Sequence, residues 1–354
     1  MSLTAFNPSA VLVLPDDDRD PPAVRRAEID ESAKPQSNID SLNLKIYSTE
    51  DLRAFTDNFS TSNLIGKTQF GQVYRGKIEE TGKEPRSVTI KTWNDQEEWY
   101  MYHDDRKVLL EEERRFLTLP PMATHPNLVN LIGYCCEEEM KGVVYDLNSM
   151  DTLHNLMTKD NFGWKQRINV AIGLASVLEF LHSQKSYYTV LNVDTAHIML
   201  DQDFNPLIFD FGLMSGGIIG KKSLAKEKTP MTPGYCDMYG CQSGFWTRWS
   251  DVYSYGGILI ELIAKRITNM KDYGRGRVKS TSRWALESVK SGKLPFELVH
   301  PSLQEDQDYN ASDALLLAEL GMSCIEFYPS KRPKMRQIVK RLVELSIVKE
   351  QFLV

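Results

Sequence analysis

Three short segments of this sequence carry residue types that could bind the phosphates of a nucleotide. A glycine-rich stretch, IGKTQFGQV, runs from residue 65 to residue 73, and its glycines let the backbone approach phosphate oxygens closely. The motif VTIK follows and ends a predicted strand in Lys91, whose ammonium could neutralise phosphate charge. The motif DFG places Asp210 after a short apolar strand, where an aspartate can hold magnesium against the phosphates.

Lys91 needs an acidic partner to aim it at a phosphate, and the next predicted helix can supply one. That helix, RKVLLEEERRFL at residues 106–117, offers Glu112 or Glu113, and the insertion LPPMAT that follows leaves its register open. The same residues also fit a structural role, in which the lysine–glutamate pair sets the helix and Asp210 caps a turn.

The chain divides into a strand-rich part and a helix-rich part that would position these residues. A capped, amphipathic short helix is predicted at 48–59. Alternating and β-branched stretches predict strands at 64–78, 87–93 and 142–147. Beyond residue 150, helical spacing of apolar residues predicts helices at 164–182, 250–266, 314–325 and 335–345. We therefore expect an α+β protein with a small β-rich lobe, a larger α-helical lobe and a hinge at 145–148.

The composition is that of a soluble globular protein. Its 42 Lys and Arg against 48 Asp and Glu give a net charge of -6, whereas nucleic-acid binders are basic, so we expect no nucleic-acid partner. No apolar run is long enough for a membrane span, so we expect no membrane insertion. The five cysteines lack zinc-ligand spacing, and we expect free thiols in a reducing, cytoplasmic compartment.

Residues 1–44 are predicted to form a disordered acidic tail. Prolines interrupt it, and residues 16–31 are mostly charged without apolar periodicity. Such a segment cannot bury enough apolar area to offset the entropy of ordering it. A partner-binding arm is the alternative interpretation. One folded domain is expected at 45–350, with its small lobe at about 60–146 and its large lobe at about 149–350.

The order and spacing of these motifs resemble a eukaryotic protein kinase domain over roughly residues 46–350. The stretches FSTSNLIGKTQFGQVYRG, VTIK, HPNLVNLIGYCCE, GVVYDL, FDFGL and SDVYSYGGILIELI carry the resemblance. The leading DNFSTSNLIG segment is similar, more narrowly, to plant receptor-like and receptor-like cytoplasmic kinases. The resemblance implies a bilobal kinase fold, ATP and Mg²⁺ as cofactors, and other protein kinases or immune receptors as partners. The nucleotide-binding residues that it implies are Ile65, Gly66, Lys67, Thr68, Gln69, Phe70, Gly71, Val73, Lys91, Glu112, Tyr145 and Leu147.

The catalytic loop departs from the kinase pattern H-R-D-L-x-x-x-N at its chemical positions. Alignment on the strand that follows puts Val190, Leu191, Asn192 and His197 at the histidine, arginine, aspartate and asparagine. Asn192 is a neutral amide and cannot accept the substrate's hydroxyl proton. Leu191 cannot pair with an activation-loop phosphate. His197 offers nitrogen where magnesium prefers oxygen, so it is a doubtful metal ligand beside Asp210.

Three further positions differ from the kinase pattern. Asp194 stands where a lysine near the transferred phosphoryl group is expected, and it would repel a phosphate. Thr68 replaces the second glycine of the glycine-rich loop and adds bulk there. The A-P-E segment is replaced by residues 237–239, Asp-Met-Tyr, so we expect that its usual ion pair with Arg332 cannot form.

Half of a nucleotide site thus remains beside a degraded phosphoryl-transfer site. Lys91, Asp210, Gly212 and Asp251 are retained. We expect a catalytically impaired kinase, a pseudokinase, that acts as an adaptor or regulator of an active kinase or immune receptor. The alternatives are a slow serine/threonine kinase, because proximity and electrostatics alone leave residual rate, and a nucleotide-responsive switch without catalysis.

Overall fold

The computed structural model describes most of the chain from Leu44 onward, as part of one compact unit, Asn43–Val354. The described residues are 44–67, 71–93, 104–185, 187–191, 193–211, 215–216, 234–243, 246–268 and 280–352. The predicted acidic tail lies outside them except for Leu44, which packs against the core. The disorder of the tail therefore stays a prediction.

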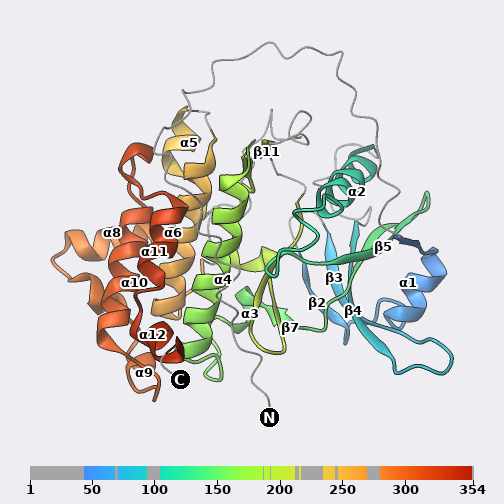
Figure 1. Ribbon diagram of the computed structural model, residues 1–354, viewed down its shortest axis with the longest axis horizontal. Coiled ribbons are helices and arrows are strands. Elements are labelled where there is room, and N and C mark those ends of the chain that lie inside the picture. The colour runs from blue at the N-terminus through green and yellow to red at the C-terminus, as the bar shows by residue number, and fades with distance from the viewer. Residues whose placement is uncertain are drawn as a thin grey trace. The chain divides into compact units, whose positions relative to one another are not determined.

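A six-stranded sheet forms the first part of this unit, at the right of Figure 1. The strands follow the order β1-β5-β6-β4-β3-β2, and neighbours are antiparallel except for the parallel pair β1 and β5. The central strand β4 lies between β3 and β6, which explains why most side chains of its β-branched run are buried. The strands are β1 (Lys45–Ile46), β2 (Leu64–Lys67), β3 (Gln72–Ile78), β4 (Arg86–Trp93), β5 (Leu131–Cys136) and β6 (Lys141–Tyr145).

Two helices accompany this sheet. Helix α1 (Thr49–Phe55) begins at the predicted capping box, in which Ser48 Oγ accepts from the Asp51 amide at 3.1 Å and the Asp51 carboxylate accepts from the Ser48 amide at 2.9 Å. The helix ends earlier than predicted because residues 57–59 adopt positive φ. Helix α2 (Asp104–Leu117) packs on β5 and β6 and carries the acidic residues expected near Lys91.

The second part of the unit is mainly helical and is organised around α6 (Arg248–Ala264). This helix is buried from Ser250 onward and packs against α4 and α10, as its nearly continuous apolar sequence predicts. Figure 1 shows these helices side by side at the left of the molecule. The remaining helices are α3 (Leu153–Leu156), α4 (Trp164–Ser183), α5 (Met238–Ser243), α8 (Thr281–Lys290), α9 (Pro301–Gln304), α10 (Ala311–Cys324), α11 (Met335–Leu342) and α12 (Ser346–Phe352).

Short strands at the junction of the two parts carry the expected site. Strands β7 (Ser149–Thr152), β9 (Ile198–Asp201) and β10 (Pro206–Ile208) form a three-stranded sheet in the order β10-β9-β7. A 3-10 turn, Thr195–His197, leads into β9, and Asp210 follows β10. Strand β8 (Tyr188–Thr189) pairs with β11 (Ser215–Gly216). The predicted α+β architecture, with strands first and helices second, is confirmed.

Two cysteines differ from the expectation of free thiols. Cys236 and Cys241 are joined in a disulfide, whereas Cys135, Cys136 and Cys324 are free. Helix α5 begins at Met238, between the two cysteines, and its first turn brings Cys241 close to Cys236. The expectation is therefore wrong for this pair.

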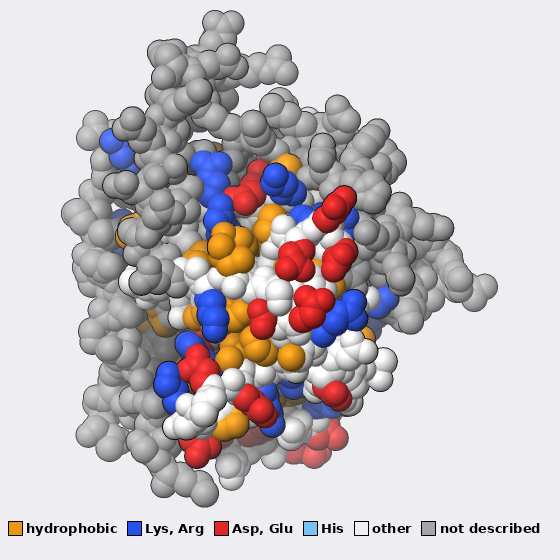
Figure 2. Space-filling view, turned by 90° about the vertical axis from the view of Figure 1, so that its right-hand side faces the viewer, with side chains coloured by type: hydrophobic (Ala, Val, Ile, Leu, Met, Phe, Trp, Pro, Cys, Tyr) orange, Lys and Arg blue, Asp and Glu red, His pale blue; other side chains and the backbone are white. Residues whose placement is uncertain are grey.

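The face at the right of Figure 1 carries charges of both signs. Figure 2 looks onto it and shows acidic and basic side chains interspersed with hydrophobic ones. Near β4, Arg86 pairs with Asp146 at 2.6 Å and Lys83 pairs with Glu80 at 2.7 Å, and all four side chains are exposed by a third or more. Such surface pairs contribute little to stability. Among the described helices, none is long and apolar enough to cross a membrane.

Candidate active site

Lys91 lies at the centre of the predicted nucleotide site and is fully buried. Its Nζ is 2.7 Å from Glu113 Oε2 and also forms an ion pair with Asp210 Oδ1. The same ammonium lies 4.1 Å from the ring centroid of buried Trp93. The acidic partner is therefore Glu113, and the assignment of Glu112 to this site is wrong.

Glu113 could have been chosen from the sequence by helical geometry. Apolar residues Leu109, Leu110, Phe116 and Leu117 of α2 are all buried. Residue 113 lies three or four positions from each of them and so occupies the middle of the inward face. Glu112 lies beside this face rather than on it.

Glu113 also connects the lysine to two other parts of the site. Its Oε1 accepts a hydrogen bond from the Asp210 amide at 3.2 Å and another from the Tyr145 hydroxyl. Burial and then the charge of Glu113 raise the pKa of Tyr145 well above its usual value. Tyr145 was expected among the nucleotide-binding residues, but its hydroxyl is directed at α2.

The second oxygen of Asp210 faces a histidine. His197 Nε2 lies 3.1 Å from Asp210 Oδ2, and His197 Nδ1 lies 2.8 Å from Asp194 Oδ2. Burial opposes a charged imidazole, but the carboxylates of Asp194 and Asp210 outweigh it and raise the pKa of His197 to about 10. Burial likewise opposes a charged Asp210, but Lys91 and then His197 hold the pKa of that carboxyl well below its usual value.

Asp194 is held in place by the 3-10 turn that it begins. Its Oδ1 accepts from the amides of Ala196 at 2.8 Å and His197 at 3.1 Å, which is an N-cap arrangement. The carboxylate is buried, and its other oxygen, Oδ2, lies 2.8 Å from His197 Nδ1. The residue expected to repel phosphate thus has two internal roles, as a cap and as a counter-ion.

The backbone of the catalytic loop is anchored by Asp251 of α6. Its carboxylate accepts from the amides of Val190 and Leu191, each at 2.9 Å, and lies 2.9 Å from His182 Nε2. Leu191 has a φ of 66°, in the left-handed region that costs energy for a branched side chain. Its side chain clusters with Cys236 and partly buried Trp246. Asn192, the expected proton-acceptor position, lies outside the described residues.

The glycine-rich segment is described only at its two ends. Ile65, Val73 and Leu147 are buried, and their contact with a nucleotide stays a prediction. Position 71 requires a glycine, because the backbone of Thr92 lies so close that a Cβ would overlap its carbonyl oxygen. Gly66 has free space around its Cα, and Lys67 is exposed. Residues Thr68, Gln69 and Phe70 lie outside the described part of the chain.

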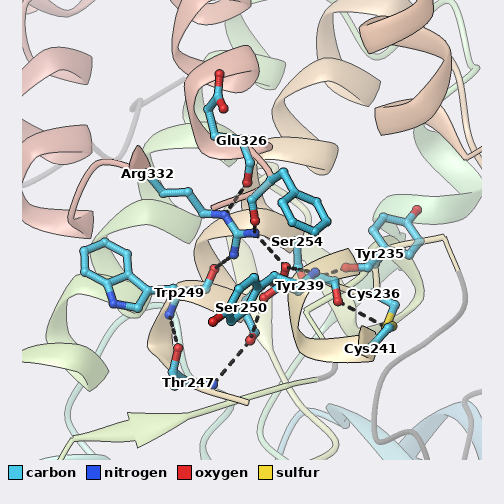
Figure 3. A network of polar contacts seen from close by, with 12 residues as sticks. Tyr235, Cys236, Tyr239, Cys241, Thr247, Trp249, Ser250, Ser254, Glu326 and Arg332 are labelled. Atoms are coloured by element: carbon cyan, nitrogen blue, oxygen red, sulfur yellow. Dashed lines mark hydrogen bonds and ion pairs between the residues drawn. A yellow bond between two sulfur atoms is a disulfide. The ribbon is translucent and has the colours of Figure 1, made fainter. Parts of the chain in front are cut away.

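Arg332 has an ion-pair partner outside the usual glutamate position. Its Nη2 lies 2.6 Å from Asp237 Oδ1, with both side chains buried, and its other nitrogens donate to backbone carbonyls of Glu326 and Trp249 (Figure 3). Asp237 also accepts from Ser250 Oγ at 3.2 Å. Tyr239 cannot form the usual pair, as expected, but a carboxylate two residues earlier, that of Asp237, reaches the same guanidinium.

The family comparison agrees with this geometry. The model of the family described as "Protein tyrosine and serine/threonine kinase" matches residues 59–342. This chain belongs to the protein kinase family. The bilobal kinase fold expected from the motifs is thereby confirmed.

Plant kinases are among the relatives of this kinase chain. It is 30% identical over 343 residues to the probable serine/threonine-protein kinase PBL12 of Arabidopsis thaliana, covering 92% of this chain and 78% of the relative. It is 30% identical over 319 residues to the serine/threonine-protein kinase BIK1 of the same plant, covering 87% and 78%. It is 29% identical over 323 residues to receptor-like cytoplasmic kinase 176 of Oryza sativa subsp. japonica, covering 88% and 79%.

Protein kinases generally use ATP with magnesium ions, which prefer oxygen ligands. In this kinase both oxygens of Asp210 face internal cations, and His197 directs nitrogen atoms at the two carboxylates. Within the described part of the chain, no three His, Cys, Asp or Glu side chains surround a common metal position. The charged side chains of this site therefore contact one another directly.

Proposed function

We propose that this kinase-family chain is catalytically impaired and acts as an adaptor or regulator in plant receptor-kinase or immune signalling. The observation that carries the proposal is the set of contacts at Asp210, in which Lys91 forms an ion pair with Oδ1 and His197 Nε2 lies 3.1 Å from Oδ2. Phosphoryl transfer depends on metal ions that neutralise the charge developing on the phosphates. An aspartate that is already neutralised by its neighbours is poorly placed for that task.

The sequence of the catalytic loop supports the same proposal. Asn192 is an amide at the position where a carboxylate accepts the substrate proton, and general-base catalysis is typically worth about 10²–10⁴-fold in rate. Asp194 stands where a cationic lysine would contact the phosphoryl group, and it is buried as a cap. These losses act on the same step, so efficient transfer of the ATP γ-phosphate is not expected.

The chain keeps the folded arrangement that a binding partner would recognise. The Lys91–Glu113 pair joins β4 to α2, and Phe211 packs on Phe116 of α2 with ring centroids 4.7 Å apart. A regulator that works by binding needs this shape rather than turnover. We propose other protein kinases or immune receptors as partners. Similarity to receptor-like cytoplasmic kinases supports a cytoplasmic location, with the plasma membrane reached through those partners.

A gain-of-function assay tests this proposal. The purified full chain is incubated with labelled ATP, magnesium and a protein substrate, beside the single variant Asn192→Asp and the double variant Asn192→Asp/His197→Asn. The wild type should transfer no phosphate, and the double variant should gain activity because it regains a base and a free Asp210. Substantial transfer by the wild type that neither substitution increases would contradict the proposal.

A slow serine/threonine kinase is the alternative function. It is favoured by the intact Lys91–Glu113 pair and by Asp210 in its usual place beside the lysine. This alternative predicts measurable wild-type turnover that rises in the single variant Asn192→Asp. Absence of wild-type transfer under prolonged incubation would reject it.

A further inference from the structure

A single carboxylate just after the hinge, that of Asp151 on β7, receives side chains from both parts of the kinase domain. Its Oδ1 accepts a hydrogen bond from Asn155 Nδ2 at 2.7 Å, and its Oδ2 lies 4.0 Å from Arg75 Nη2 on β3. Arg75 also donates to the backbone carbonyl of Met150. One arginine therefore ties β3 to the segment that follows the hinge.

The side chain of Asn155 extends this connection to β2. Its Nδ2 donates to the backbone carbonyl of Ile65 at 3.1 Å, in addition to its bond with Asp151. Asn155 is positioned by the first turn of α3, where its backbone amide donates to the N-cap oxygen, Thr152 Oγ1, at 3.3 Å. The pairing of β2 with β3 shifts register at Ile65, so that within the described ladder no residue lies opposite it. The Ile65 carbonyl is thus left for Asn155.

The hinge itself is fastened to the central strand β4. Thr89 Oγ1 donates to the Leu147 carbonyl at 2.9 Å and lies 3.0 Å from Ser149 Oγ, and the Thr89 and Ser149 side chains are buried. At the surface, Arg86 pairs with Asp146 at 2.6 Å. Hinge closure and opening need a few residues whose backbone angles can change freely. A hinge that is held along its length by side chains has little of that freedom.

These contacts lie where the kinase resemblance implies that a nucleotide binds. Ile65 and Leu147, two of the implied nucleotide-binding residues, are each only 6% exposed. A nucleotide bordered by both of them would lie beside the hydrogen bond from Asn155 to Ile65. We propose that Arg75, Asp151 and Asn155 form a latch that holds β2 and β3 against the hinge segment, so that a nucleotide enters only after the latch opens.

Partial exposure makes this latch reversible. The side chains of Arg75 and Asp151 are 40% and 28% exposed, and Asn155 lies at the surface. Exposed ion pairs and single hydrogen bonds each stabilise a protein only modestly, so the closed and open forms differ little in free energy. A ligand that binds only the open form then shifts the population toward it. The inference goes beyond the proposed function, because a kinase fold that transfers no phosphate could still bind nucleotide freely.

ATP binding to the full chain, measured by titration calorimetry with a metal chelator present, tests the latch without catalysis. The variant Asn155→Ala removes the bond to Ile65 and should bind ATP roughly two- to tenfold more tightly than the wild type, because the apparent affinity follows the fraction of open molecules. The double variant Arg75→Met/Asn155→Ala should bind more tightly still. Adenosine should give the same order, because the latch acts on entry rather than on phosphate.

The variant Asn130→Ala is the matched control. Asn130 is exposed, and its backbone carbonyl, which alanine retains, accepts from the Asp146 amide at the hinge at 2.8 Å. This control should bind ATP like the wild type. Weaker binding by Asn155→Ala would overturn the proposal, because it would mean that Asn155 holds the nucleotide instead of excluding it.

Hydrogen exchange without ligand follows the latch directly. The backbone amides of β2 and β3 should exchange faster in the double variant than in the wild type and in Asn130→Ala. Equal exchange in the three proteins would overturn the proposal, as would faster exchange without tighter ATP binding. The outcome can be told apart from the test of catalysis. Phosphate transfer by the wild type would defeat only the proposed function, and an ATP affinity that the latch variants leave unchanged would defeat only the latch.

Discussion

At the scale of single residues, the role of a side chain that is missing from a motif can be taken by a nearby residue outside that motif position. Lys91 and Asp210 were identified from their motifs because a strand lysine and the aspartate of DFG have fixed places along the chain. The usual partner of Arg332 is lost at Tyr239, as the motif indicates, but the motif does not show that the carboxylate of Asp237 can reach the same guanidinium. The contact between His197 and Asp210 joins residues 13 apart and depends on how β9 and β10 meet, which no local pattern specifies.

The Arg332–Asp237 pair gives a stability prediction. Replacing Asp237 with alanine should lower the free energy of unfolding by about 3–5 kcal/mol, because it leaves a buried guanidinium without its counter-ion. The comparison is Asp160→Ala, which removes an ion pair between Lys265 and an aspartate that is 97% exposed and should have little effect. Chemical denaturation of both variants measures the difference, and equal stability of the two would contradict the assignment.

At the scale of elements, the sequence predicts which segments form helices and strands better than where they end. Helix α1 has its predicted cap but stops at Phe55, because the following residues enter positive φ. Helix α6 was predicted from its apolar sequence, but that sequence does not indicate which residues contact its buried Glu261. Glu261 accepts from Tyr235, Thr268 and Thr281, three residues brought together by the packing of α6 and α8 with the residues just before α5.

Glu261 predicts a pH dependence of stability. Burial raises the pKa of Glu261 to about 7, against hydrogen bonds that lower it. The unfolded chain loses this proton near its usual value of 4.5 and the folded chain retains it to about 7, so stability falls as pH rises through this window. The contribution is present in full at acidic pH and decreases by roughly 3 kcal/mol above neutral pH.

The variant Glu261→Gln should flatten this part of the stability curve, because the amide does not titrate. Glu287→Gln, which changes an exposed glutamate paired with Arg283 on α8, should leave the slope unchanged. Denaturant unfolding at a series of pH values gives both curves. A wild-type slope that survives in Glu261→Gln would assign the titration to another group.

A helix cap gives a smaller prediction at the same scale. Ser48→Ala removes the side-chain acceptor for the Asp51 amide at the start of α1 and should cost about 1 kcal/mol of stability. Ser62→Ala, on an exposed turn after the helix, is the control and should change stability little. Thermal unfolding gives the melting temperatures of the two variants. An unchanged melting temperature for Ser48→Ala would show that the cap does not stabilise the domain.

At the scale of the whole molecule, one ion-pair chain joins the two parts of the kinase domain. Lys91 and Glu113 belong to the sheet-bearing part, and Asp194, His197 and Asp210 lie beyond the hinge. In a kinase that holds Mg²⁺ and ATP, these ligands would neutralise the same groups. Here Lys91 and His197 contact these carboxylates within the domain itself.

This arrangement predicts that Lys91 is a stabilising residue even without ligands. Lys91→Met should cost about 3–5 kcal/mol, because Glu113 and Asp210 would remain buried without their shared cation. Lys77→Met, an exposed lysine on neighbouring strand β3, should have little effect. Ligand-free denaturation of both variants checks this, and a Lys91→Met variant as stable as the wild type would refute it.

The central claim, that this kinase fold does not transfer phosphate, is tested most directly by the initial rate of labelled phosphate transfer from ATP to protein substrate. The wild type is compared at equal folded concentration with Lys91→Arg, which keeps the buried positive charge but changes its contact with phosphate. Both proteins should show the same background rate. A wild-type rate well above background that Lys91→Arg abolishes would contradict it.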